Sequence, residues 1–179
     1  MRFEELDNVT RRYMLVEFDT EQASGNPYMP KNLSVLGRQA FPDLMRSAIR
    51  SGNDDSLIEA LRDPALWEVM ESYEKNGVVR QRRINIGHAA ERLGLTEFNT
   101  WYVRGLARRL MDEGVEFCQV YRAAPPKGEP AECAQHEGRI YPVRDIYQGH
   151  RRRYWPEPGN PTILSIPAGP SCHHTIRRV

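Results

Sequence analysis

The last third of the chain is bracketed by two pairs of residues of metal-binding type. Cys133 and His136 have two residues between them near its start, and Cys172 and His174 stand two positions apart near its end. The stretch between the pairs is rich in Pro and Gly and has little apolar periodicity, so it lacks the pattern of a segment that builds its own core. Two Cys/His pairs around such a stretch predict one shared metal ion that holds it in place.

Spacing and residue type together favour zinc. A Cys and a His with two residues between them fold over one ion in a tight turn, and Gly138 follows where that turn needs positive φ. Cys172 and His174 point to the same side of an extended chain, so they supply two further ligands. Two thiolates and two imidazoles suit tetrahedral zinc. His173 is an alternative to His174 as ligand, and buried free cysteines with exposed histidines are the alternative to any metal site.

A closed site with four protein ligands leaves no coordination position for a substrate, so the predicted zinc is structural. Glu137 becomes a candidate general base only if water replaces one ligand. An HNH-type nuclease is the sharper enzyme alternative, but only residues 175–179 follow His174, too few for the metal-binding helix of such nucleases. Phosphate-binding Gly loops, Gly-x-Ser-x-Gly and His-Glu-x-x-His are all missing. The sequence therefore predicts no enzyme.

Apolar periodicity predicts an α+β fold whose N-terminal half is helical. Helices are expected over residues 3–22, from Phe41-Pro42, after Asp54 or Asp55, and after Asp63-Pro64. The first of them is expected to bury Leu6, Val9, Tyr13 and Val16. A long central helix is expected over residues 87–113 and is capped by Gly114. Its apolar stripe comprises Leu95, Phe98, Tyr102, Leu106 and Leu110.

The strands are expected to be short and antiparallel. Asn76-Gly77 is a preferred two-residue turn and predicts a hairpin near residues 71–83. Residues 115–121 alternate as a strand in which Cys118 is a small core residue, and residues 124–128 break that strand. Two further strands are expected at 139–143 and 162–166. We therefore divide the chain into a mainly helical region, 1–83, and a second region, 84–179, with the zinc-stabilised, loop-rich end.

Net charge is +1, from 25 basic and 24 acidic residues, and it argues neither for nor against a nucleic-acid partner. The distribution of the basic residues along the sequence is more informative than the net charge. One basic cluster comprises Arg80, Arg82 and Arg83, and a second comprises Arg151, Arg152 and Arg153. Each is either a solvated edge or a contact with phosphate or an acidic partner. Tyr154 and Trp155 beside the second cluster offer base stacking or, alternatively, packing for a Pro-rich loop.

No stretch approaches the roughly 20 apolar residues of a membrane helix, so no membrane partner is expected. The first residues carry acids and no apolar core, which is unlike a signal peptide. The protein is therefore expected to be made in a reducing cytoplasm. Its three cysteines are an odd number, and in that compartment metal binding or burial is favoured over disulfides.

The stretch 89–100, AAERLGLTEFNT, lies in the expected central helix and is followed by Gly114, a strand and the two Cys/His pairs. In this order of motifs, residues 84–179 resemble the phage Mu F-like family of head-morphogenesis, or minor capsid, proteins, whose helix reads Ala-x-Arg-Ile-Ala-Arg-Thr-Glu. In the family, as here, a Gly and a strand follow the helix. A Cys-x-x-Cys then precedes an apolar residue, a Gly and a short strand, and a Pro-rich His-Pro-Asn-Cys-Arg-Cys-like segment closes the domain. In this chain, segment 133–141 corresponds to the Cys-x-x-Cys part of the pattern, and segment 170–176 corresponds to the closing segment.

Each half of the pattern keeps its first Cys and has a His, His136 or His174, where the family has its second Cys. Such an exchange preserves a zinc ligand. The sequence departs from the pattern at Leu95, where the family has Arg, and at Ala168-Gly169, where it has a His. The resemblance implies a virion protein of the capsid interior or portal vertex, with portal protein, major capsid protein and packaged DNA as partners. A zinc-dependent nuclease and a zinc-stabilised nucleic-acid-binding module remain the alternatives.

Overall fold

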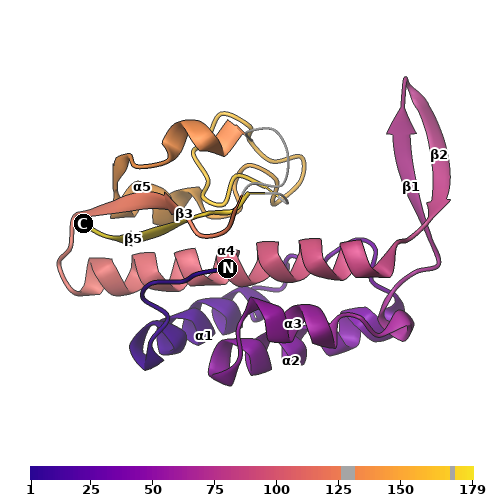
Figure 1. The fold of residues 1–179 in the computed structure, drawn as a ribbon, viewed down its shortest axis with the longest axis horizontal. Coiled ribbons are helices and arrows are strands. Elements are labelled where there is room, and N and C mark those ends of the chain that lie inside the picture. The colour runs from indigo at the N-terminus through magenta and orange to yellow at the C-terminus, as the bar shows by residue number, and fades with distance from the viewer. Residues whose placement is uncertain (126–131, 170–171) are drawn as a thin grey trace.

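The computed structural model describes residues 1–125, 132–169 and 172–179, and these form three layers (Figure 1). The middle layer is the long helix α4 (Ile86–Asp112). On one side of it lie α1 (Asn8–Gln22), α2 (Val35–Ser51) and α3 (Asp54–Ala60). On the other side lie a small antiparallel sheet and α5 (Val143–Gly149). This mixture of helices and two small antiparallel sheets is consistent with the α+β class that the sequence predicts.

Helix α4 is buried on almost every side along its middle. Residues 96–103 are buried without interruption, because layers cover the helix from both directions. The expected stripe is mostly confirmed, since Phe98, Tyr102, Leu106 and Leu110 are all fully buried. Leu95 is only half-buried, and Trp101 is buried on a different side of the helix. Tertiary packing thus buries more of this helix than a one-sided apolar pattern predicts.

One hydrophobic core runs through both halves of the chain. It extends from Met14 in α1, through Trp101 and Leu106 in α4, to Ile176 near the C-terminus. The approach of α1 to α4 is close, because a Cβ atom on Gly105 would lie 2.6 Å from the backbone nitrogen of Met14. The division at residue 83 stays a prediction, since α4 packs against elements from both of its sides.

The predicted hairpin is present as β1 (Met70–Lys75) and β2 (Val78–Arg83), which pair in register from Met70↔Arg83 to Lys75↔Val78. Asn76 and Gly77 adopt φ values of 55° and 73°, as the predicted turn requires. The hairpin projects away from the three layers at one end of α4 (Figure 1). All of β2 is exposed, so this ribbon contributes little to the core.

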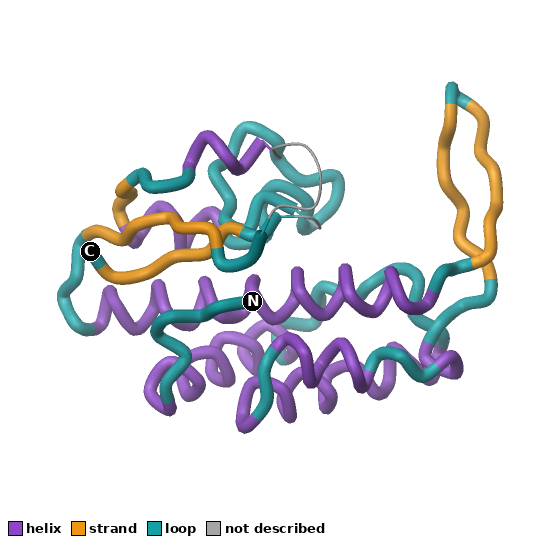
Figure 2. Tube along the Cα trace, in the orientation of Figure 1, coloured by secondary structure: helices purple, strands orange, loops and turns teal. Residues whose placement is uncertain are grey.

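The second sheet has the order β4-β3-β5, with β3 (Phe117–Arg122) between β4 (Ile140–Pro142) and β5 (His174–Arg178). Long loops fill most of the interval between α5 and β5 (Figure 2). Cys118 is buried in β3, as predicted. The strand expected over 162–166 is wrong, because none of these residues pairs in a sheet. Thr162 instead lies in a turn, where its backbone N–H donates to the Asn160 side chain at 3.0 Å.

Residues 126–128 of the expected break at 124–128, and Pro170-Ser171 of the family-like segment, lie outside the described residues. Helix α5 and strand β5 were not expected. Val143 and Ile146, three positions apart, bury one side of α5, but a run of seven residues is too short to show helical periodicity clearly.

The N-terminal helices differ from prediction mainly at their starts. Asp7 caps α1 by accepting from the backbone N–H groups of Val9 and Thr10, so residues 3–7 precede the helix. Its buried residues include Met14 and Phe18, whereas Val16 is 61% exposed, and the expected apolar side is therefore wrong. Met14 and Phe18 are the residues that face the apolar surface of α4. The periodicity of α1 alone did not identify them as buried.

Helix α2 begins at Val35 with Ser34 as its cap, and Pro42 lies inside it; the expected start at Phe41-Pro42 is wrong. Helix α3 is capped by Asn53, whose side chain accepts from the backbone N–H of Ser56, and not by Asp54 or Asp55 as expected. The Asp54 carboxylate pairs with the N-terminal amine instead. The element after Asp63 is a single 3-10 turn, η1 (Pro64–Leu66), capped by Asp63 as expected.

Candidate metal centre

Three of the predicted ligands, Cys133, Cys172 and His174, meet beside the end of β3. Cys133 lies in the 3-10 helix η2 (Glu132–His136), and His174 is the first residue of β5. The β3–β5 register pairs Arg122 with His174, which brings the start of β5 to the end of β3. Asn99 of α4 fixes the same point by donating its side-chain amide to the His174 carbonyl at 2.9 Å. Backbone pairing and the core thus position the cluster.

The three side chains have the geometry of a metal site. Nδ1 of His174 lies 3.1 Å from Sγ of Cys133 and 3.8 Å from Sγ of Cys172, and all three ligand atoms lie within 4.8 Å of one another. Ligands of tetrahedral zinc are about 3.5–3.8 Å apart, given bonds of about 2.3 Å to sulfur and 2.0–2.1 Å to nitrogen. The cluster is therefore within metal-binding distance.

The cluster is enclosed. Cys133 and His174 are each 1% exposed, and Cys172 is 6% exposed. Hydrogen bonding between the sulfur atoms lowers the pKa of the Cys172 thiol and raises that of Cys133, because one remaining proton is shared between them. The same Cys172 sulfur raises the pKa of His174. Such a group combines a thiolate with an imidazole in a space closed to solvent, as a structural metal site does.

A carboxylate and a guanidinium lie on the side of the His174 ring that faces away from the sulfur atoms. Its Nε2 lies 3.3 Å from Oε2 of Glu137, and Arg122 in turn holds that carboxylate at 2.8 Å. The Arg122 guanidinium, with a smaller contribution from His174, keeps the pKa of Glu137 below its ordinary value. Because Nδ1 faces the sulfur atoms, the contact at Nε2 orients the ring, as carboxylates commonly do for histidines that bind metal. The sequence placed Glu137 next to the site but did not predict this role.

The two remaining candidate ligands lie outside the cluster. Nδ1 of His136 lies 2.6 Å from the Tyr141 hydroxyl, and the described group of possible ligands does not include this histidine. His173 points elsewhere, with its Nδ1 3.0 Å from the Pro125 carbonyl. Between the two histidines near the C-terminus, the geometry therefore selects His174.

The arginine clusters divide into buried and exposed members. Arg151 is 3% exposed, and its guanidinium donates to both oxygens of Glu97 at 3.1 and 2.7 Å. Burial by itself lowers the pKa of Arg151, but the adjacent Glu97 carboxylate raises it well above its ordinary value, so this side chain is a charged part of the interior. The contact role considered for Arg151 is thus corrected, because its guanidinium is out of reach of an external partner.

Four of the other basic candidates remain at the surface: Arg80, Arg82, Arg83 and Arg152 are exposed, and Arg153 is half-buried. Glu97 is the sequence signal that could have revealed the pair with Arg151. An acid in the apolar part of α4 is expected to be buried, and a buried acid needs a cation as its partner. Tyr154 and Trp155 make edge contacts with Tyr28 at 5.9 and 5.7 Å between ring centroids, which is the packing alternative of the sequence analysis.

Comparison with protein-family models, with curated proteins and with solved structures found no match. Among the described residues, no helix is both long and apolar enough to cross a bilayer.

Proposed function

We propose that Cys133, Cys172 and His174 hold one zinc ion whose role is structural. Two sulfurs and one imidazole nitrogen are the donor set that zinc favours, and they are nearly closed to solvent. A catalytic zinc needs a coordination position that substrate or water can reach. Ligands that are 1–6% exposed argue against such access. The enclosed donor set is the reason for choosing a structural role over hydrolysis.

His136 is the proposed fourth ligand. It lies three residues after Cys133 in the same short helix, and its sequence spacing is that of a metal knuckle. Its imidazole must exchange the Tyr141 hydroxyl for the ion, which requires a change in the side chain. Burial lowers the pKa of His136, so the ring is held in the neutral form that binds metals.

We further propose that the chain is a non-enzymatic minor capsid or head-morphogenesis protein of the Mu F-like kind. One observation carries this proposal: the two halves of the family-like motif, Cys133 and the Cys172–His174 segment, converge on one point although 41 residues separate Cys133 from His174. Convergence is expected if both halves bind one ion, and it has no reason to arise if they are unrelated. Portal protein and major capsid protein are the proposed partners, in a virion assembled in the host cytoplasm.

Co-expression with a tailed-phage portal protein from the same source tests the assembly role. The chain should co-purify with the portal protein or with capsids, and Cys133→Ser should weaken that association by loosening the C-terminal end. Absence of the chain from both portal complexes and purified capsids would contradict the proposal.

A nuclease assay separates the enzyme alternative. Cleavage of DNA that requires a divalent metal and is lost in His136→Gln, Glu137→Gln and His174→Gln would favour a nuclease. We expect no such cleavage, because the cluster is enclosed and Glu137 is already paired with Arg122.

A further inference from the structure

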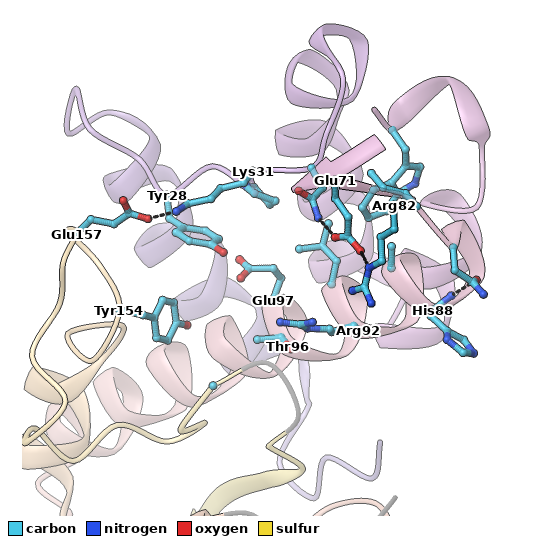
Figure 3. A pocket seen from close by; sticks show the side chains of 18 of the residues that line it. Tyr28, Lys31, Glu71, Arg82, His88, Arg92, Thr96, Glu97, Tyr154 and Glu157 are labelled. Carbon is cyan, nitrogen blue, oxygen red and sulfur yellow. Dashed lines mark hydrogen bonds and ion pairs between the residues drawn. The ribbon is translucent and has the colours of Figure 1, made fainter. Parts of the chain in front are cut away.

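A cavity of about 860 Å³ opens between the base of the β1–β2 hairpin, the first half of α4 and two loops (Figure 3). Its lining also includes Ala168 and Gly169, which come just before Cys172 in the sequence. Members of both basic clusters line it, since Arg82 and Arg83 stand on one wall and Arg153 on another. Its size falls within the roughly 300–1,000 Å³ of small-molecule sites. The fold thus joins two clusters that the sequence separates by about seventy positions.

One end of the cavity is arranged to receive an anion. Nε of Arg82 donates to Glu71 at 2.7 Å, and the other Glu71 oxygen accepts from Asn32 at 2.8 Å. The Arg82 guanidinium also lies 5.0 Å from the centre of the Tyr73 ring. These contacts hold Arg82 through its Nε and through one face of its guanidinium, which lies over the Tyr73 ring. The terminal amino groups of the guanidinium are left for a ligand. A guanidinium held in this way loses little conformational entropy when it binds.

Arg92 supplies a second cation at the same end. It is exposed on α4 and makes no ion pair with any described residue. Figure 3 shows the Arg82 and Arg92 guanidinium groups pointing toward the same part of the cavity. Of the carboxylates that line the cavity, Glu71 pairs with Arg82, Glu97 with Arg151 and Glu157 with Lys31. None of these pairs balances the charge of Arg92. An anion placed between Arg82 and Arg92 relieves their repulsion.

The opposite end of the cavity has different chemistry. Tyr28 and Tyr154 stand there with ring centroids 5.9 Å apart, and Glu157 pairs with Lys31 at the rim. Burial raises the pKa of both tyrosines, so their hydroxyls stay neutral and serve as hydrogen-bond donors and acceptors. Aromatic surface with polar hydroxyls suits a flat heterocycle.

We propose that this cavity binds a nucleoside phosphate. The phosphate lies between Arg82 and Arg92, and the base lies against Tyr28 and Tyr154. Inorganic phosphate alone would use only the cationic end, whereas the aromatic end needs a base. A free nucleotide and one unit of a single-stranded nucleic acid present the same groups, and the test below distinguishes them. The inference does not rest on the zinc site or on the proposed assembly role.

Isothermal titration calorimetry of the full chain tests it with adenosine 5′-monophosphate, ribose 5-phosphate and a thymidine decanucleotide. Arg92→Gln and Arg82→Gln should each weaken nucleotide binding about tenfold or more, since a hydrogen bond to a charged group contributes about 1.5–3 kcal/mol. Arg12→Gln is the matched control, because Arg12 is an exposed arginine on α1 that does not line the cavity. Ribose 5-phosphate should bind about tenfold more weakly than the nucleotide, because it lacks base stacking of about 1–3 kcal/mol.

Decanucleotide binding that is tighter than mononucleotide binding and is lost in Arg92→Gln would identify a single strand as the source of the ligand. Comparable affinities would identify a free nucleotide. Failure of every probe to bind would overturn the proposal, as would binding that Arg82→Gln and Arg92→Gln leave unchanged. Equal affinities for ribose 5-phosphate and the nucleotide would also overturn it, because the aromatic end would then contribute nothing. Thermal melting of each variant verifies that the substitution leaves the fold intact.

Discussion

Nδ1 of His174 lies 3.1 Å from Sγ of Cys133, although 41 residues separate them along the chain. That interval contains β4, α5 and the loops that follow, which bury few side chains of their own. A metal ion bound here would join the first and last parts of this interval. The binding free energy of such an ion then contributes to the stability of the folded segment.

Glu137→Gln should lower zinc affinity by about 10- to 100-fold without removing a ligand. The carboxylate contacts Nε2 of His174 at 3.3 Å, and partners of this kind orient a histidine and raise its basicity. Competition with a chromophoric chelator measures the affinity. Glu116→Gln is the control, because Glu116 is exposed just before β3. An unchanged affinity in Glu137→Gln would show that the contact does not position the ring.

Arg151→Met should destabilise the fold by about 3–5 kcal/mol. Removal of this guanidinium leaves the buried Glu97 carboxylate without its bidentate partner. Urea unfolding measures the loss, and the exposed neighbour Arg152→Gln should change stability by less than about 0.5 kcal/mol. If both substitutions had the same small effect, the buried pair would not hold α4 to the C-terminal loops.

The fold could be predicted where the signal was local. Asn76-Gly77 determines its own turn, and the spacing of Phe98, Tyr102 and Leu106 reveals a helix without reference to the rest of the chain. The buried side of α1 could not be predicted in this way. Met14 and Phe18 are buried because α4 lies against them, and that contact depends on residues about ninety positions away.

Cys133, Cys172 and His174 could be predicted as members of the candidate site. Paired cysteines and histidines are unusual both at a solvated surface and in an apolar core, so such pairs indicate metal binding. Their arrangement was not predictable. The choice of His174 over His173 depends on the β3–β5 register, and the role of Glu137 depends on where Arg122 points. The cavity was missed because its lining comes from three separate stretches of the chain, 28–32, 67–97 and 153–169, and no single segment carries its pattern.

Gly105→Ala should destabilise the fold by about 1–3 kcal/mol. The new Cβ would lie 2.6 Å from the Met14 backbone nitrogen, so α1 and α4 must move apart. Gly87→Ala is the matched control near the start of the same helix, where a Cβ meets nothing closer than 3.6 Å. It should be neutral or stabilise by up to about 1 kcal/mol, because alanine favours helix. Thermal or urea unfolding compares them, and equal effects would contradict the close α1–α4 packing.

Stability should fall as pH drops below about 6.5, in part through His150. Burial, with Arg151 and Arg104 nearby, holds the pKa of His150 well below its ordinary value, even though Glu21 approaches Nε2 at 3.9 Å. The unfolded chain therefore binds a proton that the folded chain does not. This contribution is fully present above pH 6.5 and is lost at up to about 1.4 kcal/mol per pH unit below it.

His150→Phe keeps a ring against Trp101, which lies 5.2 Å from the His150 ring, and removes the titrating group. Between pH 6.5 and pH 5, its loss of unfolding free energy should be about 2 kcal/mol smaller than that of the natural sequence. Urea unfolding at the two pH values measures the difference. Parallel losses in both proteins would mean that His150 is protonated in the folded state.

The most direct test of the proposed structural metal is the zinc content of the purified protein and its cysteine variants. We predict about one zinc per chain, lost in both Cys133→Ser and Cys172→Ser and kept in Cys118→Ser, because Cys118 is a core residue of β3 outside the cluster. One zinc per chain retained in both Cys133→Ser and Cys172→Ser would contradict the assignment. So would a zinc-free protein in which Cys133 and Cys172 form a disulfide.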